Sequence, residues 1–136
     1  MKKLYIDGCW IEGSEVAKTR NPSNTNEVVD EYFRASAAQT EDAISAAQAA
    51  SESWAQSNVQ TRADILDFIG SELLGRKKAL GELLAREEGK TLAEAIGEVT
   101  RAGASFKFYA QEALRIHGQK FNSVRANKLK TSYVSA

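Results

Sequence analysis

The chain has 136 residues, with 18 basic and 18 acidic side chains, so its formal net charge at pH 7 is zero. This balance argues against nucleic acid or an anionic membrane as a partner and favours a small metabolite or another protein. The length suits one domain, and because no apolar run reaches the roughly 18 residues of a membrane span and no signal peptide is evident, we expect a soluble, cytoplasmic protein.

The N-terminal part of the chain is typical of β-structure. Leu4-Tyr5-Ile6 and Cys9-Trp10-Ile11 are β-prone runs joined by Asp7-Gly8, a strong hairpin signal, so we expect a hairpin over 3–12. Turn residues follow at 21–26, and the β-prone run after them predicts a third strand near 27–35.

Helical periodicity begins near residue 40. Thr40 is the expected N-cap of a helix over 41–56, and Ser57-Asn58-Val59-Gln60 has the form of a capping box that starts a second helix, ending near Gly75-Arg76. A shorter helix follows, with Leu80, Leu83 and Leu84 on its apolar stripe. We expect Gly89 to end it in a left-handed conformation.

Thr91-Leu92-Ala93-Glu94 is a further capping box, and the apolar stripe after it predicts a helix that continues to Gly118, roughly 39 Å long. Its apolar surface is broader than one packing partner requires. Alternation near the C-terminus then predicts a strand over 128–134. The fold class predicted for the chain is therefore α+β: a hairpin, a strand, about four helices and a C-terminal strand.

Reactive motifs are scarce in this sequence. Gly89-Lys90-Thr91 has the ending of a phosphate-binding loop, but Leu84 stands where that motif needs a glycine. Cys9 lacks an activating neighbour in the sequence, and His117 fits a structural role at a helix end. With one cysteine and one histidine, the chain offers neither a zinc site nor a catalytic triad.

The run from Glu88 to Val99, followed by Phe106-Lys107-Phe108-Tyr109-Ala110 and Arg115-Ile116-His117-Gly118, resembles the N-terminal region of aldehyde dehydrogenases. The resemblance implies that the chain is part of the α/β fold of that family. It assigns residues 1–123 to the N-terminal segment of the coenzyme-binding domain and residues 124–136 to the start of the oligomerisation hairpin, with the catalytic domain absent.

The complete enzymes of that family oxidise an aldehyde to a carboxylic acid with NAD or NADP. Their nucleophilic cysteine, general-base glutamate and oxyanion-binding asparagine belong to Gly-Gln-x-Cys, Glu-Leu-Gly-Gly and Pro-Trp-Asn motifs, which would all lie beyond Ala136. We therefore expect an inactive fragment with no catalytic residue and no bound cofactor. Its expected partner is the remainder of the polypeptide, or further copies in a homo-oligomer. The alternative is a self-standing helical interaction module.

Two site assignments follow from the resemblance. Many family members hold a monovalent cation, and the matching positions here are the main chain at Thr19 or Arg20 and the side chain of Glu87. Arg101 matches a position near the aldehyde entrance, where a guanidinium can attract a substrate carboxylate. The alternative for Arg101 is a surface ion pair with Glu98.

Overall fold

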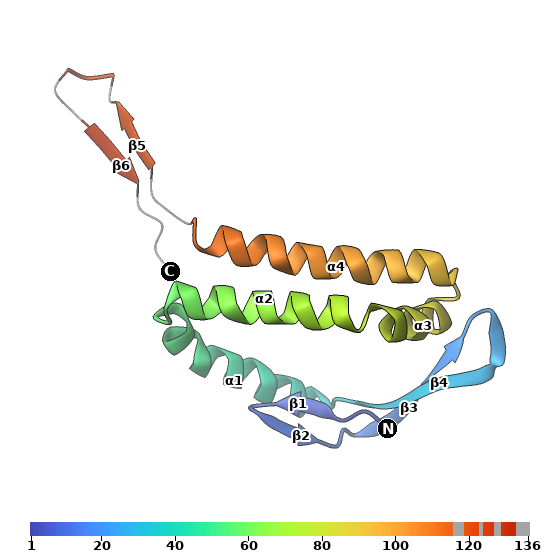
Figure 1. The fold of residues 1–136 in the computed structure, drawn as a ribbon. Helices are drawn as coiled ribbons and strands as arrows, with labels where there is room; N and C mark the ends of the chain where they lie inside the picture. Colours follow the sequence, from blue (N-terminus) through green and yellow to red (C-terminus); the bar gives the residue numbers. More distant parts are fainter. Residues whose placement is uncertain (116–118, 123, 127–128, 133–136) are drawn as a thin grey trace.

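The computed structural model describes residues 1–115, 119–122, 124–126 and 129–132, which contain three antiparallel hairpins and four helices (Figure 1). The predicted α+β class is confirmed. The elements, in chain order, are β1 (Leu4–Ile6), β2 (Cys9–Ile11), β3 (Glu15–Asn21), β4 (Asn24–Arg34), α1 (Ala37–Ala55), α2 (Val59–Gly75), α3 (Lys77–Glu88), α4 (Leu92–Ala113), β5 (Gln119–Asn122) and β6 (Leu129–Ser132).

The first hairpin forms where the sequence predicts it. Asp7 and Gly8 both have positive φ, 49° and 76°, as a two-residue turn of this kind requires. The turn sets the register that pairs Leu4 with Ile11 and Ile6 with Cys9. Two turn residues are thus sufficient to define the pairing of β1 with β2.

The second hairpin is longer than expected. β4 contains most of the strand predicted near 27–35 but begins at Asn24, and its partner β3 was missed because its charged and polar residues obscure the alternation. Lys2 runs along the other edge of β4: its N–H donates to the Glu31 carbonyl at 2.7 Å, and its carbonyl accepts from Phe33 at 3.0 Å. The N-terminus is therefore fixed to the second hairpin.

The starts of the first two helices correct the sequence-based expectation. α1 begins at Ala37 rather than 41, because Ser36 and Gln39 form a capping box one turn earlier. Thr40 lies inside the helix, where its hydroxyl donates to the Ser36 carbonyl at 3.0 Å. α2 is capped by Asn58, which accepts from the Gln60 N–H at 2.8 Å, and not by Ser57.

α4 begins at the predicted capping box but ends at Ala113, with Leu114 as its C-cap, so it is shorter than expected. Its 22 residues correspond to about 33 Å. Residues 116–118, which include His117, lie outside the described residues. The predicted C-terminal strand is present as β6, whose antiparallel partner β5 was not expected; residues 128, 133 and 134 of the predicted span are also outside.

The helix α4 packs along α2 and α3, and α1 contacts β1 (Figure 1). Glycines allow this close contact: a Cβ at Gly70 would lie 2.9 Å from the Gly103 carbonyl oxygen, and one at Gly81 would lie 2.6 Å from Ile96 Cγ1. The buried hydrophobic residues of the described chain are small or medium in size, namely Ala63, Ala95, Val99 and Ala110. Among the described residues, no helix is both long and apolar enough to cross a membrane.

Candidate functional site

The end of α3 meets the turn between β3 and β4, which brings together residues that are more than sixty positions apart. Gly89 ends α3 with φ 70°, as predicted, and its carbonyl accepts a hydrogen bond from Ser23 Oγ at 3.2 Å. A Cβ at Gly89 would lie 3.0 Å from Ser23 Oγ and 3.2 Å from Pro22 Cβ. Glycine is therefore favoured here both by the backbone conformation and by the close approach of the turn.

Glu27 is the centre of a polar cluster beside this contact. Its Oε1 accepts from Arg86 Nε at 2.7 Å and lies 2.6 Å from Arg86 Nη2, while its Oε2 accepts from Asn21 Nδ2 at 2.8 Å. The Asn21 amide and then the Arg86 guanidinium hold the pKa of Glu27 below its ordinary value. The cluster joins β4 to α3 with charge-assisted hydrogen bonds.

Lys90 links the end of α3 to the first half of α4. Its ammonium group forms ion pairs with Glu88 and, at 2.8 Å, with Glu98 Oε2. Glu88 and then Glu98 raise the pKa of Lys90. Gly89 is a helix stop and Thr91 a helix start, so the segment is not arranged as a phosphate-binding loop.

Arg101 lies on the exposed outer side of α4, and Glu98 pairs with Lys90 instead of with it. In the described part of the chain, no hydrogen bond or ion pair is made by Arg101. The alternative assignment of Arg101 to an ion pair with Glu98 is therefore not what the structure shows.

The candidate cation ligands lie on the two elements that meet at this junction. The β3–β4 register shifts between Thr19 and Arg20 and again between Arg20 and Asn21, and such bulges redirect backbone groups away from the partner strand. Arg20 Nη1 donates to the Thr25 carbonyl at 3.0 Å. Glu87 is exposed, and within the described ranges no hydrogen bond or ion pair joins it to Thr19 or Arg20.

Chemical groups that could complete a metal site are few at this junction. Among the described residues, no cluster of three or more His, Cys, Asp or Glu side chains could hold a metal ion. The predicted ligands, the main chain at Thr19 or Arg20 and the carboxylate of Glu87, supply the oxygen atoms that a hard monovalent cation prefers, and the described structure does not test whether they converge on one.

The residues that the sequence did not single out at this junction are Ser23, Glu27 and Arg86. Glu27 and Arg86 are 59 positions apart, so no local pattern indicates their contact. Asn21 followed by Pro22 was the available signal, because an Asx residue before a turn often accepts from the backbone two positions later. Asn21 Oδ1 does accept from the Ser23 N–H at 2.9 Å.

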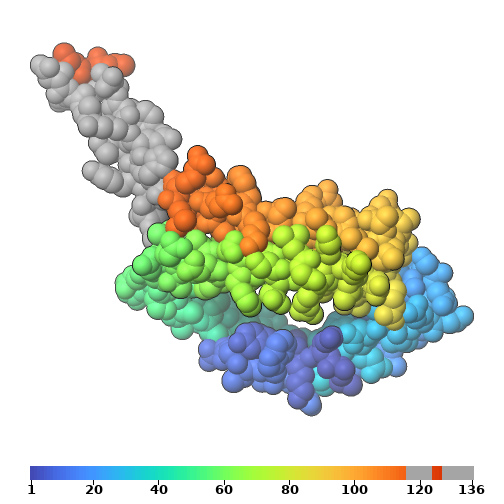
Figure 2. Space-filling view, in the orientation of Figure 1, coloured from blue at the N-terminus to red at the C-terminus, as the bar shows by residue number. Residues whose placement is uncertain are grey.

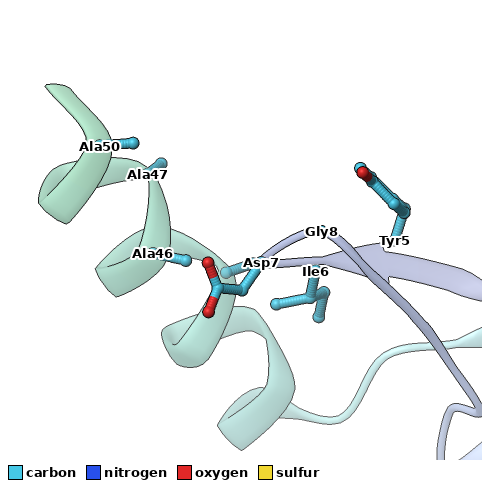
Figure 3. Close-up of a pocket in the computed structure, with 8 residues that line it drawn as sticks. Tyr5, Ile6, Asp7, Gly8, Ala46, Ala47 and Ala50 are labelled. Atoms are coloured by element: carbon cyan, nitrogen blue, oxygen red, sulfur yellow. The ribbon is translucent and has the colours of Figure 1, made fainter. Parts of the chain in front are cut away.

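A concave region lies between the β1–β2 turn and α1 (Figure 3). Its cavity has a volume of about 330 Å³, and its lining consists of the turn region Tyr5–Gly8 and alanines of α1. The Asp7 side chain is directed toward α1 and is the only ionisable group of the turn itself (Figure 3). Cys9 is exposed in β2 and is not among the lining residues, so this cavity does not combine a nucleophile with a base.

The comparisons with known proteins agree with this arrangement. Residues 10–135 match the model of the aldehyde dehydrogenase family. The chain is 37% identical over 120 residues to the α-ketoglutarate semialdehyde dehydrogenase of Haloferax volcanii, covering 87% of this chain and 25% of that protein. It is 32% identical over 119 residues to the glutarate-semialdehyde dehydrogenase of Pseudomonas aeruginosa, covering 86% of this chain and 24% of that one.

Solved structures give the same result. A betaine aldehyde dehydrogenase of Staphylococcus aureus, in complex with NAD⁺, superimposes with a TM-score of 0.84 at 28% identity, covering 93% of this chain and 26% of that one. The chain belongs to the aldehyde dehydrogenase family. It spans about a quarter of the length of the curated relatives that it matches.

Proposed function

We propose that this chain is the N-terminal segment of an aldehyde dehydrogenase, whose complete form oxidises an aldehyde to a carboxylic acid with NAD or NADP. The observation that carries the proposal is the match of residues 10–135 to the family, combined with a fold that superimposes on a quarter of a family member. The NAD⁺ bound to the Staphylococcus aureus enzyme supports a nicotinamide cofactor.

Residues 1–123 belong, in this proposal, to the coenzyme-binding domain, and residues 124–136 begin the oligomerisation hairpin of a homo-oligomeric enzyme. The chain itself supplies scaffold and not chemistry. Its one cysteine, Cys9, is exposed on a hairpin, and no positioned base is recorded beside it in the described part of the chain. A nucleophile needs such a base, or a depressed pKa, to attack an aldehyde at neutral pH.

Arg101 contributes to substrate selection in the complete enzyme, in this proposal. Its exposed guanidinium forms no ion pair with the described residues, and Glu98, the nearest candidate along the helix, is engaged by Lys90. The relatives named for α-ketoglutarate semialdehyde and glutarate semialdehyde act on aldehydes that carry a carboxylate. A guanidinium is well suited to bind that group.

Thr19 or Arg20, through the main chain, and Glu87, through its carboxylate, would hold a monovalent cation together with a ligand from the remaining polypeptide. Such an ion would neutralise Glu87 and connect the bulged end of β3 to the end of α3. Its role in this proposal is structural.

A chimera tests the proposed function. The matching quarter of the Pseudomonas aeruginosa enzyme is replaced by this chain, and the formation of reduced nicotinamide is followed with glutarate semialdehyde as substrate. We expect turnover by the chimera and none by the 136-residue chain alone. An inactive chimera that is correctly folded, or aldehyde oxidation by the isolated chain, would contradict the proposal.

The alternative, a self-standing helical interaction module, rests on the exposed apolar side chains of the helices, which include Phe68 and Phe108. It predicts that the purified chain binds a protein unrelated to aldehyde dehydrogenases. Light scattering and an apolar dye test the module on the purified chain. A monomer that binds little of the dye would argue against it.

A further inference from the structure

Glu98 has two possible cationic partners, one within its own helix and one in the turn before that helix. Arg101 is the one basic residue three or four positions from Glu98, and Glu98 is the one acidic residue three or four positions from Arg101. Residues at this spacing are neighbours on a helix surface, and a glutamate on the N-terminal side of a basic residue is the favourable order. The helix sequence alone therefore favours a pair of Glu98 with Arg101.

The structure shows Lys90 in place of that partner. Gly89 ends α3 with a φ of 70° and Thr91 caps α4, so Lys90 lies at the turn between the two helices. Its Nζ lies 2.8 Å from Glu98 Oε2, and it also forms an ion pair with Glu88. The Lys90 side chain is only 20% exposed, and that of Glu98 is 40% exposed. Glu98 is therefore held by a partly buried cation outside its own helix.

Arg101 is left on the exposed surface of α4. Figure 2 shows α4, in yellow to orange, along one outer edge of the molecule, on the side away from the N-terminal hairpins. Among the residues that the structure describes, none forms a hydrogen bond or an ion pair with Arg101. A paired guanidinium must release its partner before it binds a second carboxylate in a bidentate manner, whereas an unpaired one binds it directly.

We propose that Lys90 is a specificity-determining positioning residue, which holds Glu98 and thereby keeps the Arg101 guanidinium free for the carboxylate of an aldehyde substrate. The inference rests on the proposed function, because it needs a complete enzyme in which that carboxylate meets Arg101. Lys90 does not touch the substrate and acts only through Glu98. Glu88 contributes as well, because Glu88 and then Glu98 raise the pKa of Lys90 and so favour its charged form.

Loss of the Lys90 ammonium group would release Glu98 to Arg101. An exposed ion pair changes a binding constant by about two- to fivefold, and the second carboxylate would also repel that of the substrate. We therefore expect Lys90→Gln in the chimera to raise KM for glutarate semialdehyde by about two- to fivefold and to leave KM for a neutral aldehyde nearly unchanged. Lys90→Arg, which keeps a cation at this position, should behave as the wild type.

Glu98→Gln distinguishes a released partner from a general effect of charge. By itself it should leave KM for glutarate semialdehyde nearly unchanged, because Lys90 already engages this carboxylate. Combined with Lys90→Gln, it should restore the KM of the unmodified chimera. An effect of charge over a distance would instead make Glu98→Gln lower KM by the factor that Lys90→Gln raises it, and that result would overturn the inference.

The matched control is Lys3→Gln, which removes a lysine from an exposed ion pair with Glu12, at 3.2 Å, in the first hairpin region. It should leave KM for both aldehydes unchanged. A rise in KM for glutarate semialdehyde as large as that of Lys90→Gln would show that the loss of any surface lysine is sufficient, and the inference would fail.

Arg101→Gln separates the inference from the proposed function. In this background, Lys90→Gln should no longer change KM for glutarate semialdehyde. If Arg101→Gln by itself leaves KM unchanged, the proposed substrate contact fails, and the inference fails with it. If Arg101→Gln raises KM but Lys90→Gln does not, the substrate contact stands and only the inference is overturned.

A second readout uses the chain itself and does not depend on catalysis. The Arg101 Nε–H resonance in proton–nitrogen NMR spectra reports whether its guanidinium has a carboxylate partner. We expect Lys90→Gln to shift this resonance and the double variant with Glu98→Gln to return it to the position of the wild type. A resonance that Lys90→Gln leaves in place, in a chain that keeps its helical circular dichroism, would overturn the inference even if the chimera were inactive.

Discussion

Replacing Gly70 with alanine tests how the helical layer is held together. A Cβ at this position would lie 2.9 Å from the Gly103 carbonyl oxygen and 3.0 Å from Lys107 Cγ. The carbonyl belongs to the backbone of α4, so it can move only if the helix moves. The control is Gly97→Ala, an identical change in the interior of α4, where a Cβ would have no recorded atom within 4 Å.

The expected change in unfolding free energy differs between the two variants. Each gains about 1 kcal/mol of helix propensity from the added methyl group. In Gly70→Ala, this gain is opposed by about 1–3 kcal/mol of overpacking at the α2–α4 contact. We therefore expect Gly97→Ala to stabilise the chain and Gly70→Ala to be about 1–3 kcal/mol less stable than Gly97→Ala.

Urea unfolding followed by far-ultraviolet circular dichroism measures this difference directly. Thermal unfolding should show a gap of roughly 3–12 °C between the two variants for a chain of this length. If Gly70→Ala is as stable as Gly97→Ala, the close approach of α2 to α4 does not penalise a side chain at Gly70, and the reasoning is refuted.

Three further changes address the caps, the polar junction and the proposed substrate contact. Thr91→Ala removes the hydroxyl that accepts from the Glu94 N–H at 3.3 Å, and it should lower the free energy of unfolding by about 1 kcal/mol in urea titrations. The control Thr61→Ala, at an exposed position, should lower it much less, and equal losses would contradict the capping role. Glu27→Gln should destabilise the chain at pH 7. The difference from the wild type should shrink as the pH falls through the lowered pKa of Glu27, because a lowered pKa contributes stability above the unfolded-state pKa that is lost as the folded-state group is protonated; a difference that grows on acidification would be the wrong sign. Arg101→Gln in the chimera should raise KM for glutarate semialdehyde by about tenfold or more and leave KM for a neutral aldehyde nearly unchanged, and equal effects on both substrates would exclude recognition of the carboxylate.

Local signals in the sequence predicted much of this fold. Asp7-Gly8 specified the first hairpin, because both positions need positive φ. Thr91 and Glu94 specified the start of α4, and Gly89 specified the end of α3. In each case the information lies within four residues, so a single sequence is enough.

The errors in the predicted helix boundaries also have specific causes. Two N-cap candidates were available for the start of α1, and Ser36, which forms a capping box with Gln39, is the N-cap instead of Thr40. Asn58 lies one position after Ser57 and reaches the Gln60 N–H instead. Apolar residues continue past Ala113, so the stripe alone gave no signal for the end of α4.

The candidate junction was the least predictable part of the molecule. Its central contact joins Glu27 to Arg86, and the pairing of Lys90 with Glu98 rather than Arg101 with Glu98 depends on how the end of α3 meets α4. These partners are determined by tertiary packing. The family resemblance located Thr19, Arg20, Glu87 and Arg101, but their roles remain proposals.

The central claim is that this chain is scaffold from an aldehyde dehydrogenase and acquires activity only with the rest of that enzyme. The most direct measurement is the rate of reduced nicotinamide formation by the isolated chain and by the chimera, side by side, with glutarate semialdehyde as substrate. The account predicts turnover by the chimera alone. Turnover by the isolated chain, or a folded chimera with none, would contradict it.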